Sequence, residues 1–165
     1  MKKELLSILM ALVAIIIPTN SWAQDVAGDE TLEPYAVLSD NNTVLTFYYD
    51  EKKAERNGMD VGPFSRINGN PNVSWYEQRE SITSVLFDAS FANCTTLTST
   101  AYWFYGFNHL TTITGISNLK TDNVEDMYRM FYGCSGLTSL DLSNFKTDRD
   151  EHGWYVLWLF RPEQP

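Results

Sequence analysis

Side chains that commonly carry out catalysis are sparse in this chain of 165 residues, which holds two histidines and two cysteines. His109 lies ahead of the C-terminal stretch and occupies a turn position that Gly136 fills in a related segment. The sequence contains no Gly-x-Ser-x-Gly nucleophile motif, no His-x-x-x-His pair and no glycine-rich phosphate loop. Acidic residues are plentiful, so a pair of carboxylates is the one catalytic arrangement left open. We therefore expect a protein that is not an enzyme and uses no cofactor.

The two cysteines occupy equivalent positions in the sequence. Cys94, Phe107 and Cys134 each precede a leucine by the same short interval. A position that accepts either Cys or Phe is expected to belong to an apolar core. An exported protein with two cysteines also permits a disulfide. Because another unit of the chain lies between the two cysteine positions, we expect them to lie beyond bonding distance and predict two buried free thiols.

Two further patterns admit either a ligand or a purely structural role. The aromatic run YWFY at 102–105 suits a platform on which sugars stack, and it equally suits the core of an irregular unit, which we favour. Four aspartates recur at repeat positions without the dense Asp-x-Asp spacing of a calcium loop: Asp122, Asp126, Asp141 and Asp148. Capping and turn roles account for them, so we expect no metal site.

An internal repeat organises residues 82–148. The segment LTTITGISNLKTD at 110–122 returns as LTSLDLSNFKTD at 137–148, and FYGFNHL at 104–110 returns as FYGCSGL at 131–137. The offset between the copies is constant at first and shortens by one position near the end, and a looser copy, ITSVLF, begins at Ile82. A nearly fixed period of this size predicts supersecondary units that stack on one another.

Each unit combines a strand-like and a helix-like pattern. Short apolar runs centred on Val85, Ile113 and Leu140 predict strands. The apolar residues of 121–131 recur at i, i+3, i+6 and i+7, which predicts a short helix with Thr121 or Asp122 as its N-cap. We therefore predict an α/β repeat, a short solenoid of about three strand rungs whose neighbours bury one another's apolar edges.

The motif MFYGCSGLTSLDLSNFKTD, preceded by TDNVEDMYRM, resembles the BspA-like leucine-rich-repeat surface proteins of bacteria. The match is specific over 118–148, moderate over 82–119 and weaker upstream. The resemblance implies a secreted or surface-displayed protein that binds other macromolecules, such as host proteins or neighbouring cells, without catalysis.

In such rungs the apolar strand residues point inward and their neighbours point outward. The candidate ligand-binding residues of this outward strand face are Ser84, Leu86, Thr112, Thr114, Ser139 and Asp141. This polar, mildly acidic surface suits contact with an extracellular protein or glycan. The formal net charge of −9 disfavours binding to nucleic acid or to anionic lipid surfaces.

Residues 1–23 read as a signal peptide. Lys2 and Lys3 precede an apolar run at 5–17, and small residues precede a cleavage point between Ala23 and Gln24. An uncleaved membrane anchor is the alternative, but the run is short for a span. We therefore expect export to the cell surface or medium, with no stable membrane span after cleavage.

Residues 24–34 read as a flexible acidic leader, and residues 35–81 as an N-terminal β cap. Two β-prone runs flank the sequence DNN at 40–42, which predicts a hairpin. The large aromatic residues of this segment suit a cap that covers the first rung. An independent ligand-binding module is the alternative, although so short a segment without disulfides or metal rarely forms a stable domain alone.

Residues 149–165 depart from the pattern, which should continue with another repeat. Codons allowed for residues 150–165, read one base later, permit TNMDGMFYGCSGLSSL, the expected next repeat. We therefore expect a frameshift, and a truncated chain able to self-associate through its uncapped last rung. A genuine C-terminal strand or short anchor is the alternative, since the stretch 154–160 is apolar, although it is too short to span a bilayer. This leaves a structural envelope segment or a non-functional gene product as alternative functions.

Overall fold

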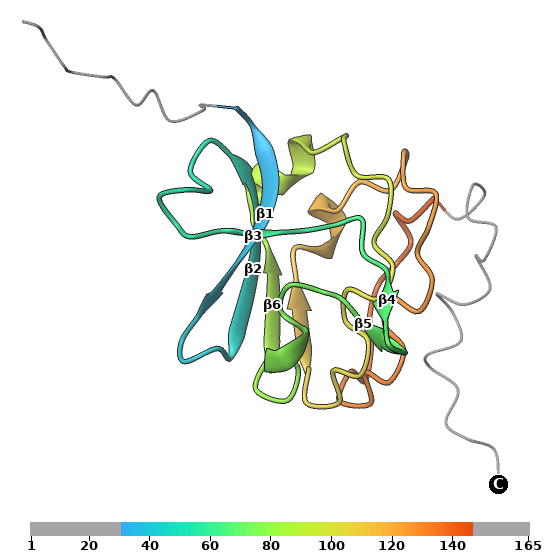
Figure 1. Ribbon diagram of the computed structural model, residues 1–165. Coiled ribbons are helices and arrows are strands. Elements are labelled where there is room, and N and C mark those ends of the chain that lie inside the picture. The colour runs from blue at the N-terminus through green and yellow to red at the C-terminus, as the bar shows by residue number, and fades with distance from the viewer. Residues whose placement is uncertain (1–30, 147–165) are drawn as a thin grey trace, which may run out of the picture.

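The computed structural model describes residues 31–146 of the chain, which form a mixed five-stranded sheet and a small two-stranded sheet (Figure 1). The main sheet has the strand order β3-β1-β2-β6-β7. Its strands are β1 (Glu33–Ser39), β2 (Val44–Asp50), β3 (Met59–Asp60), β6 (Ser84–Phe87) and β7 (Thr112–Thr114). The small sheet pairs β4 (Arg66–Ile67) with β5 (Asn70–Pro71).

Strands β1 and β2 form the hairpin expected around residues 40–42, with Val37 opposite Thr46 and Leu38 opposite Leu45. The turn places Asp40, Asn41 and Asn42 at φ values of 50°, 55° and 65°. Asp and Asn tolerate this left-handed region better than other side chains do, so the turn residues account for the reversal.

The hairpin continues directly into the rest of the main sheet. Strand β2 pairs with β6 in parallel, and β6 pairs with β7 in parallel. Leu45, Val85 and Ile113 therefore lie side by side on three neighbouring strands. Leu140, the third predicted strand centre, lies outside the described strands and packs half-buried against the core. Residues 35–50 are thus part of the same sheet as β6, because β2 lies at its centre.

The predicted α/β repeat solenoid is wrong. Residues 31–146 contain no α-helix, and the coiled segments are three short 3-10 turns: η1 (Tyr76–Gln78), η2 (Ala89–Asn93) and η3 (Ile116–Asn118). The β-strands belong to a mixed sheet that joins an antiparallel hairpin to parallel strands, in place of a ladder of equivalent rungs.

The predicted helix at 121–131 is replaced by turns and coil, since much of its backbone bonds to another segment. We call residues 98–106 and 124–132 together the coil layer. The amide of Asp126 donates to Thr98 O (3.3 Å), and the amides of Tyr102 and Phe104 donate to Tyr128 O (3.0 Å) and Met130 O (2.8 Å). These bonds use backbone groups that a helix would pair internally.

The proposed helix cap also has another role. Thr121 is buried, and its Oγ1 accepts a hydrogen bond from the Lys146 amide at 2.7 Å. Arg129, near the end of the predicted helix, has a φ of 54°, which lies outside the helical region. The apolar spacing of 121–131 therefore marks buried residues, but the backbone between them is not helical.

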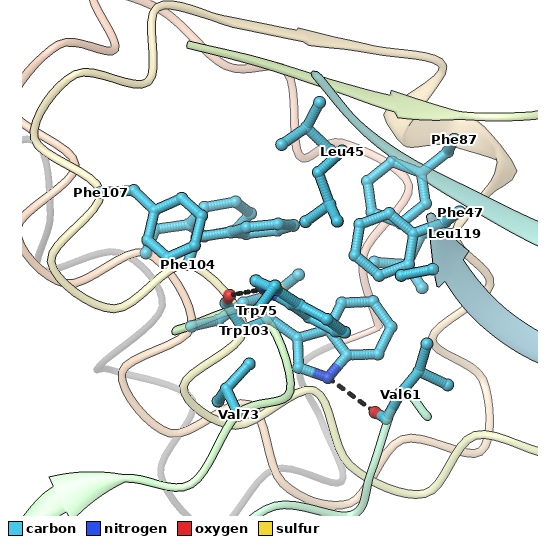
Figure 2. Packing of buried hydrophobic residues seen from close by; sticks show 14 of the residues in the cluster. Leu45, Phe47, Val61, Val73, Trp75, Phe87, Trp103, Phe104, Phe107 and Leu119 are labelled. Atoms are coloured by element: carbon cyan, nitrogen blue, oxygen red, sulfur yellow. Dashed lines mark hydrogen bonds between the residues drawn. The ribbon is translucent and has the colours of Figure 1, made fainter. Parts of the chain in front are cut away.

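The core between the main sheet and the coil layer is rich in aromatic side chains (Figure 2). Phe47 on β2 stacks on Trp103 of the coil layer, with ring centroids 4.8 Å apart, and on Phe87 of β6 at 4.7 Å. The Trp103 indole donates to Val61 O (3.0 Å), and the Trp75 indole donates to Trp103 O (2.8 Å). Buried indole nitrogens are thus satisfied, and both rings fix the coil layer against the sheet.

The predicted signal peptide (1–23), with its cleavage residues Ala23 and Gln24, lies outside the described residues. Most of the 24–34 leader and all of the segment 149–165 lie outside them as well. Between residues 31 and 146, no helix has the length and apolar character needed to cross a bilayer.

Candidate binding surface

The side chains of the main sheet that alternate with the core residues form a surface that we call the sheet face, in which Thr46 is itself buried. One row across the strands contains Val37, Thr46, Leu86 and Thr114, and the next contains Ser39, Val44, Ser84 and Thr112. Four of the six predicted ligand-binding residues, Ser84, Leu86, Thr112 and Thr114, therefore lie together on neighbouring strands β6 and β7.

The other two predicted residues, Ser139 and Asp141, lie on exposed coil that belongs to no described strand. The Asp141 carboxylate accepts a hydrogen bond from the Ser143 amide at 2.9 Å, and this bond lowers the pKa of Asp141. Asp141 thus stabilises a local turn. The structure does not place these two residues in a strand with the other four.

On β6 and β7 the sheet face is built of small polar side chains around one larger apolar residue. Leu86 is 36% exposed, whereas its inward neighbours Val85 and Phe87 are buried. Thr112 and Thr114 are exposed on the edge strand β7. The face therefore offers hydroxyls and an apolar side chain for contact with a partner surface.

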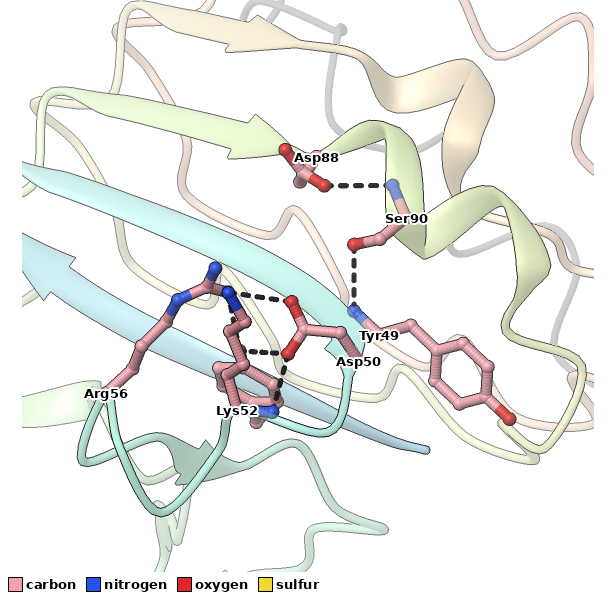
Figure 3. A network of polar contacts seen from close by, with 7 residues as sticks. Tyr49, Asp50, Lys52, Arg56, Asp88 and Ser90 are labelled. Atoms are coloured by element: carbon pink, nitrogen blue, oxygen red, sulfur yellow. Dashed lines mark hydrogen bonds and ion pairs between the residues drawn. The ribbon is translucent and has the colours of Figure 1, made fainter. Parts of the chain in front are cut away.

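A polar network fixes the segment after β2 over one end of this face (Figure 3). The Tyr35 hydroxyl donates to Asp50 Oδ1 (2.6 Å), Arg56 donates to Asp50 Oδ2 (2.9 Å), and the Lys52 amide donates to Asp50 Oδ1 (2.9 Å). The Arg56 guanidinium also lies over the Tyr48 ring, 4.1 Å from its centroid.

The network shifts the ionisation of its members. Burial raises the pKa of Tyr35, and the hydrogen bond to the Asp50 carboxylate raises it further. Burial also raises the pKa of Asp50, but hydrogen bonds from Tyr35 and Lys52 and the charge of Arg56 outweigh it, so the pKa of Asp50 is lowered. The network therefore holds one carboxylate ionised and one phenol neutral, which suits a structural role.

A surface groove of about 520 Å³ lies beside β3 and is lined in part by Glu33, Lys53, Asp60 and Phe64. Lys53 Nζ contacts Glu33 at 2.7 Å and Asp60 at 2.6 Å. Burial lowers the pKa of Lys53, but these two carboxylates raise it overall. Lys53 offsets one of the two carboxylates, so the charged side chains of the groove leave one excess negative charge, which disfavours an anionic ligand there.

The two cysteines are buried and free, and neither is bonded to the other. Phe107, the third member of the predicted series, is also buried. The Cys134 thiol donates to Phe104 O (3.0 Å), and burial raises the pKa of this thiol to about 12. A protonated, enclosed thiol is a poor nucleophile, so Cys134 acts as a core residue.

The remaining candidates for catalysis or metal binding form local contacts. The His109 ring contacts the backbone oxygen of Glu80 through Nδ1 at 2.8 Å. Asp126 Oδ1 accepts from the Tyr128 amide at 2.8 Å, and Asp122 is exposed. No group of three potential metal-binding side chains is found within residues 31–146. Asp148 lies outside the described residues.

The aromatic run at 102–105 divides between core and surface. Trp103 and Phe104 are buried, whereas Tyr102 and Tyr105 are half-exposed on the outer side of the coil layer. There they meet tyrosines of the neighbouring segment: Tyr102 contacts Tyr128 edge-on at 5.5 Å, and Tyr105 stacks on Tyr132 at 5.2 Å. We call Tyr102, Tyr105, Tyr128, Tyr132 and Arg129 the tyrosine cluster.

Sequence reasoning missed this cluster, although a signal existed. Tyr132 follows Tyr105 at the spacing between the FYG copies of the internal repeat, and Tyr128 follows Tyr102 at a spacing one residue shorter. Equivalent repeat positions that carry the same aromatic residue are expected to lie side by side.

Comparisons with known proteins identify no relative. A scan against protein-family models finds no match for this chain, and searches of curated proteins and of solved structures find none either.

Proposed function

We propose that this chain is a non-catalytic, exported binding protein whose sheet face contacts an extracellular protein or glycan. The observation that carries the proposal is the gathering of Ser84, Leu86, Thr112 and Thr114 on one outward surface of strands β6 and β7. Small hydroxyl side chains around an exposed apolar residue allow a broad partner to approach closely while hydrogen bonds fix its orientation.

Two features of the sequence support export and binding. The basic and apolar pattern of residues 1–23 favours secretion or surface display. The resemblance of residues 118–148 to BspA-like surface proteins favours adhesion to host or neighbouring cells.

A rigid support for the sheet face also favours the proposal. The network of Tyr35, Asp50 and Arg56 anchors the segment that follows β2, and the aromatic core holds the opposite side of the sheet. A surface that is fixed before contact loses little conformational freedom on binding, which increases affinity.

The test measures binding of the purified chain to an array of extracellular-matrix proteins and glycans. Leu86→Asp and Thr114→Arg place charge and bulk on the sheet face, and we expect each to reduce binding to a captured partner at least about tenfold. Lys120→Gln, an exposed change outside the sheet face, is the control and is expected to bind normally. Unchanged binding by both sheet-face variants contradicts the assignment.

A further inference from the structure

The tyrosine cluster is a second surface, separate from the sheet face. Its residues come from the coil layer, whose inward side chains Trp103 and Phe104 pack against Phe47 of the sheet. The strands that form the sheet face contribute no residue to the cluster. Binding at the two surfaces can therefore be changed independently.

Aromatic contacts link the cluster into one continuous patch. Tyr102 meets Tyr105 at 5.9 Å between ring centroids, and the Arg129 guanidinium lies 5.0 Å from the Tyr128 centroid and 5.2 Å from that of Tyr132. Tyr132 is the most open member, with 41% of its surface exposed. The patch is thus apolar and aromatic with a cation within it.

Several polar groups of the cluster have no partner in the described part of the chain. Residues 31–146 provide no hydrogen bond to the hydroxyls of Tyr102, Tyr105 or Tyr132. In the same part of the chain, no carboxylate lies within ion-pair distance of Arg129. The nearby Asp126 carboxylate is engaged by the Tyr128 amide. Three hydroxyls and one guanidinium therefore remain available for an incoming ligand.

The backbone holds Arg129 in this position. Arg129 has a φ of 54° and Tyr102 has a φ of 64°, conformations that few non-glycine residues adopt. The bonds from the Tyr102 amide to Tyr128 O and from the Gly106 amide to Tyr132 O (2.6 Å) keep the two tyrosine pairs aligned. Unfavourable backbone conformations are maintained here only because the surrounding hydrogen bonds fix them.

We propose that the tyrosine cluster binds a carboxylate-bearing polysaccharide, with sugar rings against the tyrosines and a uronate carboxylate on Arg129. Aromatic rings offer flat apolar contact to the C–H faces of a sugar, and their hydroxyls hydrogen-bond to its hydroxyl groups. A planar guanidinium pairs with a carboxylate through two hydrogen bonds. The net charge of −9 repels anionic ligands from most of the protein surface. The guanidinium of Arg129 is a local exception, where a carboxylate is attracted.

Charges of both signs act on Tyr102. Burial raises the pKa of Tyr102, and the proximity of Tyr128 and the negative charge of Asp126 raise it further, whereas the positive charges of Arg66 and Arg129 lower it. A second arginine therefore lies close enough to act on the cluster electrostatically.

The experiment titrates the full chain with oligogalacturonate, and with a neutral cello-oligosaccharide of equal length, by calorimetry at two salt concentrations. We expect the uronate ligand to bind at least about tenfold more tightly than the neutral one. Its affinity should fall as salt rises, because the carboxylate contact is screened.

Four variants assign the binding to the cluster. Arg129→Gln should lower uronate affinity about tenfold and leave the weaker neutral binding unchanged. Tyr132→Ala should lower affinity for both ligands, whereas Tyr132→Phe, which keeps the ring, should retain most of it. Lys120→Gln removes an exposed positive charge outside the cluster and should bind like the unmodified chain. Circular dichroism verifies that each variant is folded.

The proposal is overturned if oligogalacturonate does not bind, or if Arg129→Gln binds it as tightly as the unmodified chain does. Equally tight binding of polyglutamate would also overturn it, because it would show that the cluster recognises negative charge and not a sugar. Self-association that Tyr132→Ala abolishes in light scattering would assign the cluster to a second copy instead. Leu86→Asp alters only the sheet face, so it should leave uronate binding unchanged. A failure of the sheet-face proposal can therefore be distinguished from a failure of the tyrosine-cluster proposal.

Discussion

The sheet and the coil layer keep neighbouring segments together in different ways. In the sheet, β2, β6 and β7 align Leu45, Val85 and Ile113 through regular parallel pairing. In the coil layer, amides of alternate residues between 100 and 106 bond to carbonyls of 126–132, and the backbone consists largely of turns that include left-handed residues. The sequence repeat thus spaces β6 and β7 as well as the two segments of the coil layer, but only the first pair is built from strands.

The difference shows that a repeat period determines which segments are neighbours without determining their secondary structure. Hydrogen bonds between segments satisfy the backbone in both regions, so neither requires a helix. A strand of the sheet requires only that inward and outward side chains alternate. The coil layer requires particular large side chains and particular backbone conformations. Mutations should therefore affect the two regions unequally.

The largest expected effect comes from Trp103→Ala, which removes the aromatic contact between the two regions. Trp103 is fully buried, stacks on Phe47 and donates to Val61 O. We expect a loss of about 3–5 kcal/mol in the free energy of unfolding, measured by urea denaturation. Trp103→Phe, which keeps a ring, should lose less. Equal losses in the two variants would show that the indole hydrogen bond matters more than the ring contact.

Gly115→Ala tests how closely the chain approaches β6 where β7 leads into η3. Gly115 has a φ of 70°, and an added Cβ would clash with Phe87 O. We expect Gly115→Ala to lower the free energy of unfolding by about 2 kcal/mol. Gly69→Ala is the control: its φ is 88°, but the nearest atom would lie 4.0 Å from the added Cβ. Thermal unfolding of the two variants separates the effect of the steric clash from that of backbone strain. Identical losses of stability would show that backbone strain alone accounts for the effect.

Asp50→Asn affects the sheet side alone, by removing the charge that Tyr35, Lys52 and Arg56 contact. We expect the free energy of unfolding to fall by about 1 kcal/mol at neutral pH. The loss is this small because the site is partly solvated. The folded-state pKa of Asp50 is lowered, so its contribution is present above the ordinary value of 3.8 and disappears as pH falls through the folded-state value.

The measurement for Asp50 compares denaturation of the variant and the unmodified chain from neutral to acidic pH. Their difference should shrink below about pH 4. Asp60→Asn removes the exposed partner of Lys53 and should change stability little at any pH. A difference between Asp50→Asn and the unmodified chain that stays constant down to strongly acidic pH would contradict the role of the ionised carboxylate.

The smallest expected effect is the reaction of the thiols in the folded state. Cys94 and Cys134 are buried, and burial raises the pKa of Cys134 to about 12. We expect no labelling by a chromogenic disulfide reagent at neutral pH, and labelling of both thiols in denaturant. Rapid labelling of folded protein would show that the core opens readily around one of them.

The hairpin could be predicted from the sequence because its turn residues have a specific conformational tendency. Asp40, Asn41 and Asn42 tolerate positive φ, and the flanking β-prone runs supply the strands. Burial could also be predicted in part: the residues whose spacing indicated a helix at 121–131 are buried, namely Val124, Met127, Met130 and Phe131.

The backbone between those buried residues could not be predicted, because it depends on contacts distant in sequence. Carbonyls and amides of 98–106 pair with 124–132, and this pairing outweighs the local helical pattern. Four of the six predicted sheet-face residues come together because strand alternation is local. Ser139 and Asp141 do not, because the third apolar run forms no described strand.

The two borders of the main sheet, β3 and β7, are both very short strands, Met59–Asp60 and Thr112–Thr114. Another molecule adding a strand at either border would gain only a few backbone hydrogen bonds, too few to template continued growth. Within residues 31–146, the fold therefore resists fibril formation through its edges. Concentrated solutions should remain free of cross-β aggregates, and any assembly of copies should depend on side-chain contacts and be reversible by dilution.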